Sequence, residues 1–574
     1  MTEAPRSFDD VCKKAATAFL QTVVVIDNEA SLRADEDEQR KVKRSVATRK
    51  RSSAPGKEES SPQGCGKEEE AGGCSGSDAP EPDNGESELR AHRLELNQVS
   101  RAFADVELTC GVYLPSDSDP AEVDKLVTET VRAIGPTDAC VLDWQLRNND
   151  SKPAIDAIKE VLADDDSKGG RLRLILVYTA ENLAAASSEL EQELRDAGRT
   201  VTLGHRDEVP LLTGDHFRIA FANKPTGKVN FEDPGVVEWR ELPERIIREF
   251  TALSSGLLRA FALESVAAVR RDMHRILTQF DAELDPVYAG DRATKPDPDD
   301  AGRLTAEILQ SEIMLSVEAE NAEKKILGSE GCIAWLASQT PSLDDRRDVK
   351  IAWKGDRPDD ELINDDVRTK LLQEGAKNAS SINRKHVTSS FFGKEQEAEW
   401  ANRSADYAVL ATLAYHSGKR AGRPISSAPL LKFGTIIRSD EKTLLCLQPA
   451  CDAVRLEKAM PFLFITLNPK DGEFDLVLPQ GEAHARFKIP LGSGYKYLRE
   501  LHTIKFAPAD GSDVISAKAI KDASFVFTDD QGEHWEWCAQ LRDMTAVHIA
   551  QSTVNAISRI GVNEFEWLRT NAKK

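Results

Sequence analysis

Four short segments of this 574-residue chain each lead into a residue whose side chain can do chemistry. The first three segments are apolar, β-branched runs, which is the composition of strands buried on both faces of a parallel sheet. The residues that end the four segments are two acids, a hydroxyl and an amine: Asp27, Asp143, Thr179 and Lys224. Because the carboxyl ends of parallel strands lie along one edge of a sheet, where ligand sites form, we expect these side chains to meet there.

This set of side chains suits the transfer of a phosphoryl group to a carboxylate. Asp143 can attack the phosphorus atom and form an acyl phosphate. Thr179 can donate a hydrogen bond to a phosphoryl oxygen, and Lys224 can place a fixed positive charge beside the product. The sequence therefore predicts a catalytic set of Asp143, Thr179 and Lys224.

The same residues resemble the phosphoacceptor site of response-regulator receiver domains from two-component signalling. That family carries an aromatic residue three positions before the lysine, where this chain has Phe221, and a proline directly after it, here Pro225. The resemblance covers about residues 20–230, apart from an insert. It implies that Asp143 is the phosphorylated residue and that Thr179 and Phe221 form the switch. It also implies a cis peptide bond before the proline, as is common in the family.

The resemblance extends to fold and partners. It implies an α/β fold with a doubly wound, parallel, five-stranded, flavodoxin-like sheet, and a histidine-kinase-like protein as phosphodonor. An effector protein is the further partner that such a signalling role would need. The overall pattern is similar to large receiver proteins found beside histidine-kinase-like ATPases in bacterial conflict, or anti-phage, neighbourhoods.

The cofactor implied by this resemblance is Mg²⁺. Its ligands would be Asp27 and a neighbour, Asn28 or Glu29, together with Asp143 and the backbone carbonyl of Gln145. Mg²⁺ keeps several waters and takes one or two protein carboxylates. The family's second acidic position is an asparagine here, so the pocket lacks one formal charge. We therefore expect weaker Mg²⁺ binding unless Glu29 turns inward.

Alternating helices and strands must position these residues. After a helical pattern at 8–20, the predicted strands lie at 22–27, 108–114, 139–143, 172–178, 200–203 and 217–221, and the predicted helices between them at 94–103, 120–134, 153–162 and 183–196. This alternation favours a doubly wound parallel sheet. The helix expected directly after the first strand is displaced beyond an insert, residues 31–90. The composition of the insert, rich in Ser, Gly, Pro, Glu and Lys, predicts disorder.

The rest of the chain carries a different pattern. Residues 231–330 read as a helical domain, 331–425 as a mostly helical connector with an amphipathic stretch at 396–416, and 426–574 as a β-rich domain with a closing helix. Short strands separated by loops predict an antiparallel sheet or a small barrel. The receiver-like domain with its insert occupies residues 1–230.

Composition narrows the classes of function. The chain has 75 Lys and Arg against 97 Asp and Glu, a net charge of −22. This charge argues against a nucleic-acid partner and against binding to an anionic membrane. No stretch approaches 18 uninterrupted apolar residues, and the N-terminus lacks a signal-peptide core, so we expect a soluble, cytoplasmic protein. Nine irregularly spaced cysteines fit reduced thiols.

Other chemical candidates are weaker. Cys446 and Cys451 stand further apart than paired zinc ligands, and Cys446 is expected in the core. Asp475 and Glu482 flank a strand and Lys488 follows, but the Glu-x-Lys triplet of a nuclease is absent. His274 is expected to be a helix-surface or core residue. Two other functions stay open: a receiver-fold scaffold that binds a partner without phosphorylation, and an enzyme with its catalytic centre in residues 330–540.

Overall fold

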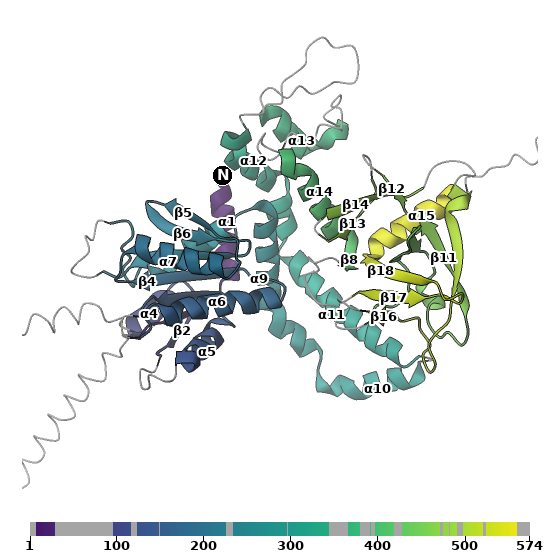
Figure 1. Cartoon of the computed structure of the whole chain (residues 1–574), viewed down its shortest axis with the longest axis horizontal. Helices are drawn as coiled ribbons and strands as arrows, with labels where there is room; N and C mark the ends of the chain where they lie inside the picture. The colour runs from purple at the N-terminus through teal and green to yellow at the C-terminus, as the bar shows by residue number, and fades with distance from the viewer. Residues whose placement is uncertain are drawn as a thin grey trace, which may run out of the picture. The chain divides into compact units, whose positions relative to one another are not determined.

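The structure is a computed structural model that describes residues 7–28, 96–115, 123–147, 150–225, 233–295, 297–343, 365–378, 391, 397–417, 428–470, 474–481, 483–490, 497–520 and 524–558. The chain divides into two compact units, Met1–Thr340 and Pro341–Lys574, which are described separately (Figure 1). The insert 31–90 and Glu29 lie outside the described residues, and the division into four segments stays a prediction.

The first unit is built on a seven-stranded sheet in the order β2-β1-β3-β4-β7-β6-β5. Five neighbouring strands are parallel, and their order, β2-β1-β3-β4-β7, is that of the flavodoxin-like fold. The predicted doubly wound, five-stranded parallel sheet is therefore confirmed. Its strands are β1 (Thr22–Ile26), β2 (Thr109–Tyr113), β3 (Ala139–Asp143), β4 (Arg173–Thr179) and β7 (Phe217–Asn223).

A hairpin adds two antiparallel strands beside β7. They are β5 (Thr202–Arg206) and β6 (Val209–Thr213). Asp207 and Glu208 turn the chain between them with positive φ of 52° and 65°, the conformation of a tight primed turn. The hairpin accounts for the long stretch of sequence between the third and fourth site segments, and it covers the edge of β7.

Helices cover both faces of the sheet (Figure 1). One face buries α1 (Phe8–Phe19), α4 (Leu96–Ala104) and α8 (Leu242–Leu253). The other buries α5 (Val123–Ile134), α6 (Lys152–Ser167) and α7 (Leu183–Asp196). The helix displaced beyond the insert is α4, which lies between β1 and β2 along the chain as the sequence predicted. The α1 helix begins at a capping box in which Ser7 and Asp10 bond each other's backbone N–H groups.

A helical segment completes the first unit, as expected. The long α9 helix (Leu257–Gln279) packs against α1, and α11 (Asp299–Ala319) packs against α9. Between them lie η2 (Ala282–Leu284) and α10 (Asp285–Thr294), and after them η3 (Glu323–Leu327) and α12 (Ser329–Leu343). None of the helices within the described ranges combines the length and apolar character that a membrane crossing requires.

The second unit is β-rich, as predicted. An antiparallel sheet runs β15-β11-β10-β9-β18-β17-β16, with β8 also paired to β18, and β12-β14-β13 form a second antiparallel sheet. The strands are β8 (Leu413–His416), β9 (Thr435–Arg438), β10 (Thr443–Cys446), β11 (Met460–Thr466), β12 (Asn468–Pro469), β13 (Leu476–Gln480), β14 (Ala483–Lys488), β15 (Leu501–Phe506), β16 (Lys518–Ala519), β17 (Phe525–Thr528) and β18 (His534–Leu541). Its helices are α13 (Asp365–Asn378), α14 (Glu397–Thr412) and the closing α15 (Asp543–Ser558), with short η8 (Ala450–Asp452) and η9 (Tyr497–Glu500).

Two details of this unit bear on the sequence predictions. The amphipathic stretch predicted at 396–416 consists of the helix α14 followed by the strand β8, which pairs with β18. Cys446 is fully buried in the core, as expected, and burial raises its pKa to about 12, so it is not a reactive thiol.

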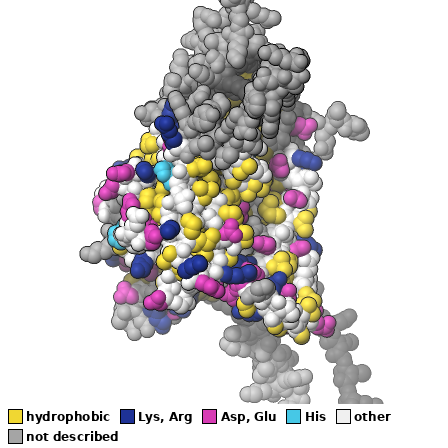
Figure 2. Space-filling model, turned by 90° about the vertical axis from the view of Figure 1, so that its right-hand side faces the viewer, with side chains coloured by type: hydrophobic (Ala, Val, Ile, Leu, Met, Phe, Trp, Pro, Cys, Tyr) yellow, Lys and Arg dark blue, Asp and Glu magenta, His cyan; other side chains and the backbone are white. Residues whose placement is uncertain are grey.

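Some large apolar side chains of this unit are exposed, among them Tyr407, Leu410 and Met544. Figure 2 shows hydrophobic side chains gathered on the face that it views.

Candidate functional site

The sheet brings the four site segments to one edge. Ile26 pairs with Leu142 in the parallel register of β1 and β3, so the next residues, Asp27 and Asp143, follow side by side. Thr179 ends β4 and pairs with Asn223, the last residue of β7. The acid, acid, hydroxyl and amine therefore come from four strands whose carboxyl ends share this edge.

Lys224 joins the two acids. Its Nζ lies 2.9 Å from Asp27 Oδ2 and 2.7 Å from Asp143 Oδ2. All three side chains are less than a tenth exposed. The ammonium group also lies 5.9 Å from the centre of the Tyr178 ring. One buried cation thus neutralises part of the charge of two buried carboxylates.

Burial and neighbouring charge set the protonation of the pair. Burial raises the pKa of Asp143 to about 6; the Lys224 ammonium pulls this pKa down, and the Asp27 carboxylate pushes it up. For Lys224, burial alone would lower the pKa, but the two carboxylates outweigh it and the pKa is raised. The lysine therefore stays charged, while Asp143 exchanges its proton in mildly acidic solution.

The loops after β3 and β4 are tied together around Asp143. The Gln145 backbone N–H donates to Asp143 Oδ1 at 3.2 Å, and the Gln145 side-chain amide donates to Glu181 Oε1 at 3.2 Å. The backbone N–H of Glu181 donates to Thr179 Oγ1 at 3.1 Å. Thr179 accepts this bond, so its own hydroxyl hydrogen can serve a ligand.

The Phe221 ring points away from the helical segment that follows the sheet. It is fully buried in the core on the face covered by α5, α6 and α7. The connection of Phe221 to α8, on the opposite face, is its backbone carbonyl, which accepts a hydrogen bond from Arg245 Nη2 at 3.3 Å. The ring as placed is a core side chain, and its expected role as a switch stays a prediction.

Two contacts that the sequence prediction missed fix the end of β7. The Asn223 side-chain amide donates to the backbone oxygens of Thr179 (3.0 Å) and Glu181 (2.8 Å). The Tyr178 hydroxyl donates to the Val237 carbonyl at 2.7 Å, and Val237 in turn donates its N–H to the Asn223 carbonyl. A polar residue at the end of an apolar strand was the signal that could have identified Asn223.

The prediction of a cis peptide bond between Lys224 and Pro225 is wrong, because this bond is trans.

Comparison with protein families agrees with this geometry. Residues 19–229 match the family described as the response receiver domain. This part of the chain is a response receiver domain. Its presence indicates a signalling role of the response-regulator type. Comparisons with curated proteins and with solved structures gave no match.

The receiver domain has a donor set that suits Mg²⁺. Asn28 Oδ1 is buried without a hydrogen-bond partner, directly after Asp27 at the end of β1. An amide oxygen with two carboxylates, those of Asp27 and Asp143, is the hard oxygen set that Mg²⁺ prefers. Within the described residues there is no group of three or more His, Cys, Asp or Glu able to hold a metal.

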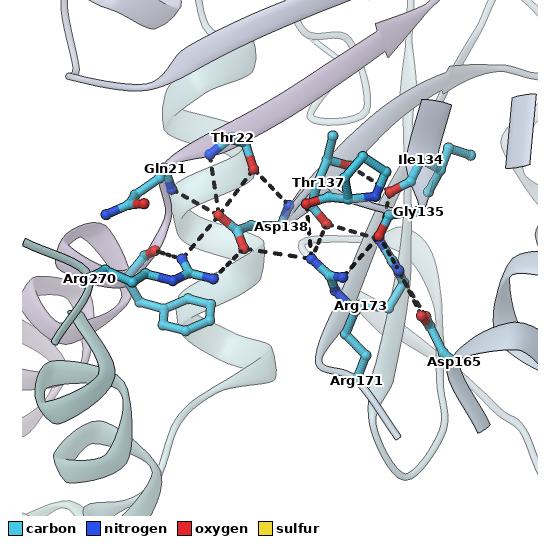
Figure 3. Close-up of polar contacts among 12 residues, drawn as sticks. Gln21, Thr22, Ile134, Gly135, Thr137, Asp138, Asp165, Arg171, Arg173 and Arg270 are labelled. Carbon is cyan, nitrogen blue, oxygen red and sulfur yellow. Dashed lines mark hydrogen bonds and ion pairs between the residues drawn. The ribbon is translucent and has the colours of Figure 1, made fainter. Parts of the chain in front are cut away.

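The opposite edge of the receiver sheet carries a network of ion pairs (Figure 3). Asp138, just before β3, accepts hydrogen bonds from the backbone N–H groups of Gln21 and Thr22 and pairs with Arg270 of α9 at 3.1 Å. Arg173, which begins β4 and is 1% exposed, binds both carboxylate oxygens of Asp165 at 2.8 and 2.7 Å. The first residues of β1 and β3 are thus linked to α9 through Asp138, and the start of β4 is linked to α6 through Arg173.

Proposed function

We propose that the receiver domain accepts a phosphoryl group on Asp143 from a histidine-kinase-like protein, with Mg²⁺ bound by Asp27, Asn28 and Asp143. The observation that carries the proposal is the contact of Lys224 Nζ with two buried carboxylates at the carboxyl edge of a parallel sheet, with a threonine on the next strand. The matched family supports it.

The proposed step moves one phosphoryl group. An oxygen of the Asp143 carboxylate attacks the phosphorus of a phosphohistidine, a new O–P bond forms, and the P–N bond breaks. The imidazole leaves with the bonding electron pair and takes a proton. Bound Mg²⁺ would neutralise charge on the phosphoryl oxygens. The Thr179 hydroxyl donates to one of these oxygens, and the Lys224 ammonium turns from the Asp143 carboxylate to another.

The protonation state of Asp143 determines the pH range in which phosphoryl transfer can occur. Only the deprotonated carboxylate is a nucleophile, and burial raises the Asp143 pKa to about 6. The reaction should therefore slow in acidic solution, and bound Mg²⁺, whose charge would lower the pKa of Asp143, should move this decline to lower pH. Lys224 stays charged throughout, because the two carboxylates raise its pKa.

The signal would leave the site through the loop after β7. A change at Thr179 acts directly on Asn223, whose side chain holds the Thr179 carbonyl and whose backbone holds Val237. The segment at Val237 leads into α8 and then into the helical segment. We propose that the helical and β-rich remainder of the chain is the output or assembly module.

A second function is favoured by one observation. The family's second acidic position is Asn28, so the pocket lacks one formal charge for a metal. This feature suits a receiver fold that binds an effector protein without being phosphorylated. In that case Asp143→Asn would leave partner binding unchanged.

Phosphate-affinity electrophoresis of the full chain tests the proposal. A small acyl phosphate with Mg²⁺ should slow a fraction of the wild-type protein, and Asp143→Asn should remove the slow band. Thr179→Ala should keep the band and change its lifetime. If wild type and Asp143→Asn migrate alike, phosphorylation is refuted and the scaffold function is favoured. Whether the protein serves phage defence, as its sequence resemblance suggests, is tested by the phage resistance of cells that carry Asp143→Asn.

A further inference from the structure

Arg147 is a buried cation whose charge is not matched by a neighbouring carboxylate. It lies in the loop after β3, four residues beyond Asp143, and is 8% exposed. Among the residues that the structure describes, none forms a hydrogen bond or an ion pair with its guanidinium group. The backbone at this position is held, because the Asp150 N–H donates to the Arg147 carbonyl at 2.7 Å.

The other buried basic side chains in the described part of the chain all pair with carboxylates. They are Arg173, Arg218, Lys224, Arg245 and Arg368. A buried charge without a partner destabilises a fold strongly, so it needs an explanation where a protein retains one. A ligand that brings the opposite charge is such an explanation. The exception at Arg147 therefore indicates a place for an anion.

The loop that carries Arg147 also carries the phosphoacceptor. Asp143 and Arg147 are four residues apart, so their Cα atoms are separated by at most about 14 Å. Trp144 and Leu146 are buried in the core that α5, α6 and α7 cover. The Gln145 side chain, between them, reaches the loop after β4 instead. This alternation favours the side of Gln145 for the Arg147 side chain.

The charge of a phosphorylated site would leave room for a second cation. The phosphoryl group on Asp143 would bring about two negative charges, and Asp27 lies at the same lysine. Against them stands the single charge of Lys224, and the amide of Asn28 replaces an acid that would help to hold a metal. The planar guanidinium of Arg147 can bind two phosphoryl oxygens at once.

We propose that Arg147 binds the phosphoryl group carried by Asp143 and is a further binding residue of the receiver site. This inference rests on the proposed function. In the free protein the guanidinium is buried and unpaired, and in the phosphorylated protein it gains an ion pair. Replacing Arg147 by an apolar residue should therefore stabilise the free receiver domain and weaken phosphoryl binding. A structural arginine would show the opposite effect on stability.

Hydrogen exchange of the full chain with Mg²⁺ and beryllium fluoride tests the proposal. Beryllium fluoride adds to a carboxylate oxygen as a mimic of a phosphoryl group, and it should protect β3 and the following loop in wild type. Arg147→Met should raise the half-saturating concentration of beryllium fluoride at least about tenfold, because one charged hydrogen-bonded pair is lost. Without ligand, the same variant should slow the exchange of β3.

Two further variants serve as controls. Arg147→Lys keeps the charge but not the planar fork, so its half-saturating concentration should lie between those of wild type and Arg147→Met. Arg195→Met removes an arginine that is 55% exposed and pairs with Glu191 at 2.6 Å on α7. It should change neither the half-saturating concentration nor the exchange of β3.

Three results overturn the inference. If wild type and Arg147→Met need the same concentration of beryllium fluoride, Arg147 does not bind the phosphoryl group, and the proposed function stands. If Arg147→Met speeds the exchange of β3 without ligand or fails to fold, the guanidinium has a structural role. If wild type is neither protected by beryllium fluoride nor slowed in phosphate-affinity electrophoresis, phosphorylation of Asp143 fails and this inference fails with it.

Discussion

Replacing Lys224 by methionine tests the electrostatic account of the site most directly. The change keeps the apolar stem but removes the charge that lies 2.9 and 2.7 Å from Asp27 and Asp143. Removing one partner of a buried ion pair typically costs about 3–5 kcal/mol, because the other charge stays buried and unpaired. Here two carboxylates lose their cation, so Lys224→Met should lose at least about 3 kcal/mol at pH 8.

The stability lost in Lys224→Met should depend on pH, in a direction set by the pKa of Asp143. In wild type the Asp143 pKa rises from 3.8 to about 6 on folding, so keeping Asp143 charged in the fold costs about 3 kcal/mol at neutral pH. A raised pKa means that stability is greatest when the group is protonated and falls as pH rises from about 4 to 6. Without Lys224 the Asp143 pKa rises further and the fall continues above pH 7. The variant should therefore recover much of its stability at pH 5.5.

Hydrogen exchange of the full chain measures this effect in the receiver domain alone. Peptides from β1 and β3 report the free energy of opening at pH 5.5 and 8, after correction for intrinsic exchange. Lys159→Met is the control: it removes a lysine that pairs with Glu193 at 2.8 Å on the surface, and it should cost less than about 1 kcal/mol. The electrostatic account is refuted if both variants lose the same stability, or if the loss in Lys224→Met is equal at the two pH values.

Three further predictions follow from the same geometry. The rate of phosphorylation of Asp143 by a small acyl phosphate, measured from pH 5 to 8, should fall in acidic solution, because burial raises the pKa of Asp143 to about 6 without metal; a higher Mg²⁺ concentration should move the fall to lower pH. Asn28→Asp should tighten Mg²⁺ binding about tenfold or more in calorimetry, because it adds a carboxylate where an amide oxygen is buried without a partner. Arg270→Met should raise the exchange rate of α9 by an amount equivalent to about 1–3 kcal/mol, because Asp138 loses a charged donor; the exposed Arg271→Met should change it by less than about 1 kcal/mol.

The sequence was sufficient for the parallel sheet because four of its five strands, β1, β3, β4 and β7, are buried on both faces. Such strands read as unbroken apolar runs, and the polar residue that ends each run marks the carboxyl edge without knowledge of the side-chain direction. This is why Asp143 and Thr179 could be placed from the sequence. The orientation of Phe221 could not, because a shift of one residue moves a side chain to the opposite face.

The sequence prediction missed two strands, β6 in the hairpin added to the receiver sheet and β8 in the C-terminal unit. Pro210 argues against a strand, yet it is tolerated in β6 of the added hairpin. The turn of that hairpin uses Asp207 and Glu208 in place of the usual Asn-Gly pair, so no turn signal was visible. β8 was missed because its residues continue the apolar spacing of α14, and only pairing with β18 makes them a strand.

The anchoring of the receiver sheet constrains how a phosphoryl group could act at a distance. β3 is five residues long and is fixed at both ends, by the bond of Asp138 to Arg270 before it and by the bond of Asp143 to Lys224 at its close. A strand of about 16 Å held in this way transmits little movement along its axis. The end of β7 differs, because Asn223 contacts both the loop beside Thr179 and the segment leading to α8. If Asp143 is phosphorylated as proposed, a new charge that displaces Lys224 would act first on this contact. We therefore predict that the signal reaches the helical segment through the loop after β7 rather than along β3.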